Sequence, residues 1–164
     1  MILKKHNVQG ICEQANGQNN GGEFFALRAY ILAKLLRNPN INVKEEVEDF
    51  INGYYGRSAA YIGEYFEKVQ GLVTEDSYIS IWTQPNNEIF TDEFINEATE
   101  LFTKAKNAAE NDEIYHRVEV VELGILYLKL TRDYRGAIEN GILDRIEEIT
   151  KREKIYFTSE ANDP

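Results

Sequence analysis

The stretch GGEFFALRAYILAKLLRNP, residues 21–39, decides the fold that we predict for this chain. It is apolar at nearly every position between residues 23 and 36, where only one arginine and one lysine interrupt it. A surface helix carries a single apolar stripe, whereas a helix that is apolar on all sides has neighbours on most of them. We therefore predict a central helix over residues 23–36. It ends before Pro39, because the residue preceding a proline is pushed out of the helical conformation.

Five further helices are predicted along the rest of the chain. Apolar residues recur at helical spacing in the segments 42–56, 58–73, 91–108, 111–130 and 135–152. The helix over residues 111–130 has a second apolar face, so it too should be largely buried.

Helix ends are marked by capping residues. Thr91 and Asn111 (or the aspartate after Asn111) are placed as N-caps, because their side chains can accept bonds from free backbone N–H groups. Asn42 takes the same position in the second helix, with Glu45 completing a capping box. Gly56 is placed to end that helix as a glycine cap.

The segments between the helices complete the domain organisation. Residues 76–90 break the helical rhythm and form a crossover, with a turn signal at residues 84–87. Residues 8–12 allow one short residual strand at the N-terminus, and a polar loop rich in Asn, Gln and Gly follows it. The fold class is all-α, a compact bundle of about six helices. The predicted divisions are the strand and loop, the helical domain and a frayed tail: residues 1–22, 23–157 and 158–164.

Composition narrows the range of partners. The formal net charge of -10 opposes binding to the phosphates of nucleic acid and to anionic membrane surfaces, and its simplest meaning is solubility. No run is long and apolar enough to span a bilayer. The single cysteine, Cys12, excludes an internal disulfide.

No specific catalytic signature is present in the sequence. His6 and His116 lack a second ligand at metal spacing, so we expect no metal, no cofactor and no catalytic residue. Glu13 differs from the other carboxylates because it follows the predicted strand and opens the polar loop that contains Gln14 and Asn16. These three residues are candidate sugar contacts, and the alternative is that Glu13 simply holds backbone amides of its loop.

A group of aromatic residues is the second candidate binding feature. Tyr54 and Tyr55 lie near Tyr61 and Tyr65 at the junction of the second and third predicted helices, and Trp82 follows them. Exposed rings of this kind can stack on sugars. Tyrosines at helical spacing are nevertheless more often core residues with the hydroxyl at the rim.

The run GEFFALRAYILAKLL (residues 22–36), NP (38–39) and VEDFINGYYG (47–56) resembles a known family. It is similar to the region after the barrel in α-glucuronidase-like glycoside hydrolases. It is closer still to a domain of unknown function in glycoside-hydrolase-like proteins of polysaccharide-degrading bacteria. In that pattern a strand ending in Phe-Glu-Gln-Gly precedes a glycine-rich loop, a helix "LRAYLLAKLLWNP" and a helix ending in "GYYG". This chain departs from it at Cys12 (usually Phe), Ala15 (usually Gly) and Arg37 (usually Trp).

The resemblance implies a (β/α)8 catalytic barrel preceding this chain, with the catalytic carboxylates in that barrel. Residues 1–22 would be a remnant of the barrel edge, and the rest a C-terminal helical accessory domain that is inactive alone. Its partners would be the barrel of the same parent protein, a poly- or oligosaccharide and a second copy in a homodimer. The parent would be periplasmic or secreted. We expect the face once covered by the barrel to be apolar, so that the isolated chain dimerises through it.

Two other functions remain open from the sequence. One is a free-standing carbohydrate- or protein-binding bundle, which needs an exposed aromatic platform. The other is a small helical enzyme with its own pair of carboxylates in one cleft, as hydrolysis of a glycosidic bond requires.

Overall fold

A computed structural model describes residues 6–7, 22–74 and 83–153 of the chain. These residues are mostly helical and contain no strand, so the predicted all-α fold is confirmed for this part; the predicted strand over residues 8–12 lies outside it. The elements are α2 (Phe25–Arg37), α3 (Val43–Tyr55), the short 3-10 helix η1 (Gly56–Ser58), α4 (Ala59–Gly71), α5 (Asp92–Ala108), α6 (Asp112–Arg132), α7 (Tyr134–Glu139) and α8 (Ile142–Glu153).

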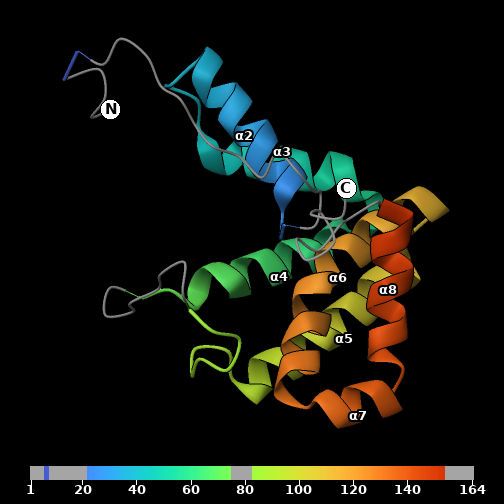
Figure 1. Ribbon diagram of the computed structural model, residues 1–164. Helices are drawn as coiled ribbons and strands as arrows, with labels where there is room; N and C mark the ends of the chain where they lie inside the picture. Colours follow the sequence, from blue (N-terminus) through green and yellow to red (C-terminus); the bar gives the residue numbers. More distant parts are fainter. Residues whose placement is uncertain (1–5, 8–21, 75–82, 154–164) are drawn as a thin grey trace, which may run out of the picture.

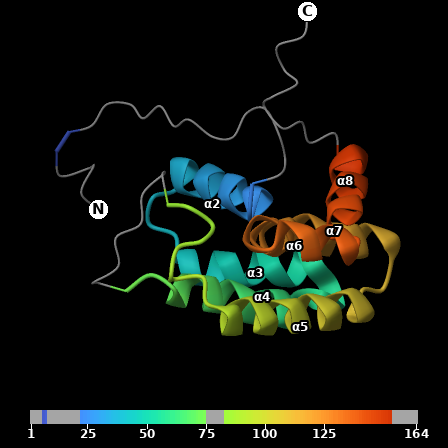
Figure 2. The ribbon, with the colours of Figure 1, turned by 60° about the horizontal axis from the view of Figure 1, so that its bottom comes forward.

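The helices are arranged around α6. Successive helices α3, α4 and α5 pack side by side, each against the next (Figure 2). Helix α6 packs along α5 and also contacts α3 and η1, while α7 and α8 pack against α6 from the other direction (Figure 1). The main core lies between α3, α4, α5 and α6 and includes the fully buried Ile62, Ala98, Phe102, Ala105 and Val118.

Helix α6 is the most buried element of the described chain. Side chains facing several directions are buried along it: Ile114, Val118, Glu119, Val121, Glu122, Leu123, Ile125, Leu126 and Leu128. One set belongs to the main core, and Leu123 and Leu126 join a second cluster with Ile146 and Ile149 of α8. The predicted second apolar face of this helix is therefore confirmed.

Helix α2 lies at the edge, so the prediction that it is central is wrong. It packs mainly against α3 (Figures 1 and 2), and Leu27 is its only buried residue. Phe24, directly before it, is also buried, whereas Leu36 is 59% exposed. A helix that is apolar on all sides can pack against other helices on all sides. The described elements, however, cover only one side of α2.

The last predicted helix, over residues 135–152, is two helices. The chain breaks between α7 and α8 at Gly141, whose φ of 70° lies in the left-handed region that favours glycine. The Asn140 side chain donates to the Gly136 carbonyl at 2.7 Å, which completes the end of α7. The helical spacing of the apolar residues continues through this break, which is why the pattern alone concealed it.

Most predicted helix ends are confirmed. The side chains of Thr91 and Asn111 accept bonds from the backbone N–H three residues later, at 3.1 and 2.9 Å. Gly56 ends α3 with a φ of 50°. Asn42 occupies the N-cap position of α3, but its side chain makes no capping bond, so the predicted capping box does not form. The turn at residues 84–87 is confirmed by a bond from the Asn87 amide to the Gln84 carbonyl at 2.9 Å.

Candidate functional site

One cavity of the described structure lies where the start of α2 and the end of α3 approach α6. Its volume is about 260 Å³. Its walls are mainly aromatic and aliphatic, with one guanidinium group, one imidazole and no carboxylate: Gly22, Phe24, Phe25, Ala26, Tyr54, Tyr55, His116, Arg117, Val120 and Val121. The cavity thus contains the two predicted tyrosines, and it suits a small, flat or apolar ligand better than acid–base chemistry.

Tyr54 and Tyr55 line this cavity without forming an exposed platform. Tyr55 is only 2% exposed, and burial raises the pKa of its hydroxyl, so it remains protonated at neutral pH. Tyr54 is half-buried and stacks on Phe50 with 4.8 Å between ring centroids. The Arg117 guanidinium lies 4.1 Å from the centroid of the Tyr54 ring, so a sugar would have to displace one of these two contacts.

Arg117 connects α6 to the end of α3. Its Nη1 atom donates to the Tyr54 carbonyl at 2.8 Å, and its Nη2 atom pairs with the Glu113 carboxylate one turn earlier on α6. The carbonyl is one of those left unpaired at a helix C-terminus, where a cation is favourable. Arg117 therefore fixes the wall of the cavity, and its charge is already compensated by Glu113.

The smaller cavity, of about 120 Å³, contains a single carboxylate, that of Glu23. The Tyr65 hydroxyl of α4 donates a hydrogen bond to this carboxylate. A Cβ atom at Gly124 of α6 would lie 3.5 Å from Oε1 of Glu23, an ordinary van der Waals contact, so α6 comes close to the carboxyl group here. Although Glu23 as a whole residue is exposed, its carboxyl end meets the apolar walls formed by Val69, Leu72, Phe90, Phe94, Ile125 and Leu128.

Burial raises the pKa of the Glu23 carboxyl, while the bond from Tyr65 and the charge of Arg28 act in the opposite direction. A carboxyl group of this kind can hold a proton nearer to neutral pH than an ordinary glutamate. Hydrolysis of a glycosidic bond, however, needs two carboxyl groups held across the sugar. The larger cavity has none and the smaller has one, so neither provides the pair that the helical-enzyme hypothesis requires.

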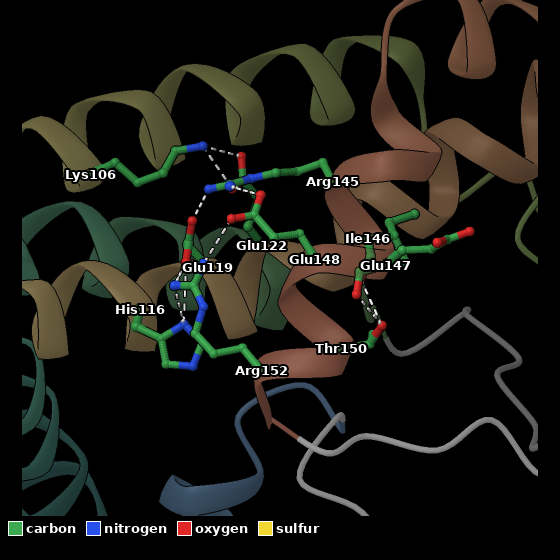
Figure 3. A network of polar contacts seen from close by, with 10 residues as sticks. All are labelled: Lys106, His116, Glu119, Glu122, Arg145, Ile146, Glu147, Glu148, Thr150 and Arg152. Carbon is green, nitrogen blue, oxygen red and sulfur yellow. Dashed lines mark hydrogen bonds and ion pairs between the residues drawn. The ribbon is translucent and has the colours of Figure 1, made fainter.

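A network of buried charges lies on the other side of α6, toward α8 (Figure 3). Glu119 of α6 is fully buried, and its carboxylate pairs with Arg145 and Arg152 of α8. Arg152 Nη1 is 3.0 Å from Oε2 of Glu119, and His116 Nδ1 is 3.2 Å from the same oxygen. Glu148 of α8 completes the network by pairing with both arginines.

A second buried carboxylate, Glu122, is compensated from α5. Lys106 Nζ lies 2.8 and 2.7 Å from its two oxygens. Close by, burial lowers the pKa of Lys129. Each of the two buried acids thus faces a cation from a neighbouring helix. An arrangement of this kind fixes how helices pack and leaves no free carboxylate for a substrate.

Two further classes of site have no support in the described part of the chain. Residues 6–7, 22–74 and 83–153 contain no group of three His, Cys, Asp or Glu side chains placed to hold a metal ion. Within the same ranges, no helix has the length and apolar character needed to cross a membrane.

The other predicted contacts, Glu13, Gln14 and Asn16, lie outside the described residues, as do Cys12 and Trp82. The sequence analysis missed three residues that the structure makes prominent: Glu23, Arg117 and Glu119. For two of these residues the sequence contains a feature that could have indicated them. Glu23 is the acid that opens the long apolar stretch, and Glu119 interrupts the second apolar face of α6. Arg117 had none, because its partner in α3 is 63 residues away.

Comparison with protein families gives one finding. Residues 1–67 match the family described as "Domain of unknown function (DUF4838)". The match covers α2 and α3 and ends within α4, so it includes the motif run over residues 22–56. Comparison with curated proteins and with solved structures gives no match. The first part of this chain is therefore similar to a domain of unknown function.

Proposed function

We propose that this chain is a C-terminal helical accessory domain of a polysaccharide-degrading glycoside hydrolase. In this role it supports a (β/α)8 catalytic barrel of the same parent protein and has no catalytic activity of its own. The sequence finding that supports the proposal is the motif run over residues 22–56. The family match over residues 1–67 includes this run and names no function.

The observation that carries the proposal is the uncovered side of α2. This helix is apolar along its whole length, yet the described helices cover only the side that faces α3. Ala29, Ala33 and Leu36 are exposed on the opposite side. Apolar surface arranged along one helix is typical of a protein–protein contact, and an adjoining catalytic domain would bury it.

The cavities are consistent with a supporting rather than a catalytic role. Neither of the two contains a pair of carboxylates, and the buried acids Glu119 and Glu122 are compensated by cations from α5 and α8. If sugar is bound by the parent protein, the residues of this chain that would reach it are Glu13, Gln14 and Asn16, which follow the predicted strand over residues 8–12 within the remnant of the barrel edge.

Two measurements test the accessory role. The isolated chain should not hydrolyse aryl glycosides or glucuronosyl oligosaccharides; turnover that Glu13→Gln abolishes would contradict the proposal. The coding region directly upstream should encode a barrel, and that barrel, expressed with a tag beside this chain, should retain it during purification. An upstream region without a barrel, or a barrel that does not retain the chain, would also contradict it.

A free-standing carbohydrate-binding bundle is the second candidate. Because Tyr54 and Tyr55 form no exposed platform, it would have to bind sugar in the larger cavity. Four aromatic side chains, Phe24, Phe25, Tyr54 and Tyr55, surround a space of about 260 Å³. Calorimetry with plant and host oligosaccharides tests this function. Binding heat that is lost in Tyr54→Ala and retained in the control Tyr134→Ala would favour this function over the accessory role. Tyr134 lies on α7 and is 61% exposed.

A further inference from the structure

Helix α2 has two opposite faces with different surroundings. The inner face contacts α3: Leu27 is buried, Ile31 packs against the main core, and Lys34 pairs with Glu46 of α3 at 2.9 Å. On a helix with 3.6 residues per turn, the opposite side is occupied by a second set of apolar residues. We call this set the outer stripe: Phe25, Ala29, Leu32 and Leu36, with Ala33 beside them.

The outer stripe is available for contact in the described structure. Ala29, Ala33 and Leu36 are exposed, and Leu36 retains 59% of its accessible surface. Phe25 and Leu32 are half-buried, and Phe25 also lines the larger cavity. The stripe therefore runs from the first to the last turn of α2.

We infer that the outer stripe of α2 docks a partner α-helix that has its own apolar stripe flanked by acidic residues. The spacing is the first reason. Successive members of the stripe are separated by four, three and four residues, the alternation that brings side chains to the seam between two helices packed nearly in parallel or antiparallel. The alanines at 29 and 33 are the second reason, because small side chains let a second helix approach closely.

The charges beside the stripe select the kind of helix. Arg28 lies on one flank of the outer stripe and Arg37 on the other, and both are exposed. Neither forms an ion pair within 4 Å with a residue in the described ranges, and the charge of Arg28 also acts on the Glu23 carboxyl. Helix α2 itself contains no acidic residue. A partner with glutamate or aspartate on both flanks would pair with these arginines, whereas a basic partner would be repelled.

The same charges disfavour a second copy of α2 as the occupant. Two copies would bring only basic flanks to the seam, because α2 contains no acidic residue, so neither arginine would gain an ion pair from the other copy. The inference rests on the proposed function only in placing the partner helix in the adjoining barrel domain. The chemistry of the partner follows from α2 alone.

Binding of two synthetic helical peptides to the whole chain tests this inference. Both peptides carry leucines at seam spacing; one has glutamates and the other lysines on the flanks. Fluorescence anisotropy should show the glutamate peptide binding roughly fivefold more tightly, as expected for two exposed ion pairs. The double variant Arg28→Glu/Arg37→Glu should reverse the preference.

Matched variants identify the surface. Ala29→Glu/Leu36→Glu adds two charges to the outer stripe and should abolish binding of both peptides. Val73→Glu/Ile138→Glu adds the same charges at exposed apolar positions elsewhere and should leave binding unchanged. Circular dichroism should show equal helicity for all variants, because the four substituted side chains are exposed.

The inference is overturned if neither peptide binds, if the two bind equally, or if sedimentation shows a dimer tighter than the peptide complex. If no peptide binds but the upstream barrel still retains the chain, the accessory role stands and only this assignment of the surface fails. If the glutamate peptide binds but the upstream region encodes no barrel, the proposed function fails and the docking surface stands.

Discussion

Glu23 lies where α2 begins and where α4 and α6 come close to it. Its carboxyl group lines an apolar cavity and accepts a hydrogen bond from Tyr65. Burial raises the pKa of Glu23, so the folded chain holds this proton more tightly than the unfolded chain does. That contribution to the free energy of unfolding is complete below the unfolded pKa and is lost as pH rises through the folded pKa.

Replacing Glu23 by glutamine should therefore change how stability depends on pH. Glu23→Gln keeps an acceptor for the Tyr65 hydroxyl and removes the charge. The native chain loses stability as Glu23 is deprotonated, and the variant does not. The free energy of unfolding of the variant minus that of the native chain should therefore be larger at about pH 7.5 than at about pH 4.5. Urea unfolding at both values measures this. Glu64→Gln, on the exposed side of α4, serves as the control, and a constant difference for both variants would contradict the prediction.

Glu119 illustrates a different use of a buried acid at the residue scale. Removing its charge in Glu119→Gln leaves Arg145 and Arg152 without their shared partner. Because both arginines retain some contact with solvent, we expect a loss of about 2–3 kcal/mol in the free energy of unfolding. Urea unfolding checks the value.

The control is Glu147→Gln, which breaks an exposed pair with Lys151 on α8 and should cost no more than about 0.5 kcal/mol. Equal effects of the two variants would show that the buried network contributes no more than a surface pair.

At the scale of the element, local sequence decides where most helices begin and end. Thr91 and Asn111 cap α5 and α6, and Gly56 ends α3, because each interaction involves residues only three or four positions apart. Helix boundaries that depend on such short-range chemistry were predictable. The break at Gly141 was also local, but the apolar spacing on both sides of it continues, so the spacing alone indicated one helix.

Two glycines test this explanation of the boundaries. Gly141→Ala should destabilise the chain by about 1 kcal/mol, because its φ of 70° is unfavourable for a side chain even though no neighbouring atom lies within 4 Å. Gly53→Ala, inside α3 and equally free of neighbours, should stabilise it by about 0.5–1 kcal/mol through helix propensity. Thermal unfolding followed by circular dichroism gives both values; shifts of the same sign would contradict the assignment.

At the scale of the whole molecule, the exposed outer stripe of α2 leads to a prediction about self-association. We expect the isolated chain to dimerise at high concentration through this stripe, more weakly than it binds an acidic helix. Added salt should strengthen the dimer, because it screens the arginines, and should weaken the complex with the glutamate peptide. Sedimentation at low and high salt measures both, with Ala29→Glu/Leu36→Glu as the monomeric control. A dimer that Ala29→Glu/Leu36→Glu leaves intact, or one that added salt weakens, would contradict this prediction.

The candidate site was only partly within reach of the sequence. Tyr54 and Tyr55 were identified as a pair, and the structure places both on one cavity. Arg117 of α6 contacts Tyr54, whereas Tyr55 is buried in the main core. The Glu23 carboxyl likewise accepts a bond from Tyr65 of α4 and lies near Gly124 of α6, and both are distant in sequence. Such environments arise only when several helices meet, so no spacing in one segment could indicate them.

The helical character of this chain, its caps and most of its boundaries follow from neighbouring residues alone, because they depend on hydrogen bonds and apolar spacing within a few turns. The position of each helix in the bundle was decided by tertiary packing. Helix α2 is the more uniformly apolar, yet α6 lies at the centre, since cations from α5 and α8 compensate Glu119 and Glu122 and make a charged helix suitable for burial. The apolar residues of a helix indicate how much of its surface can be buried. Which of its faces is buried depends on how the other helices pack against it.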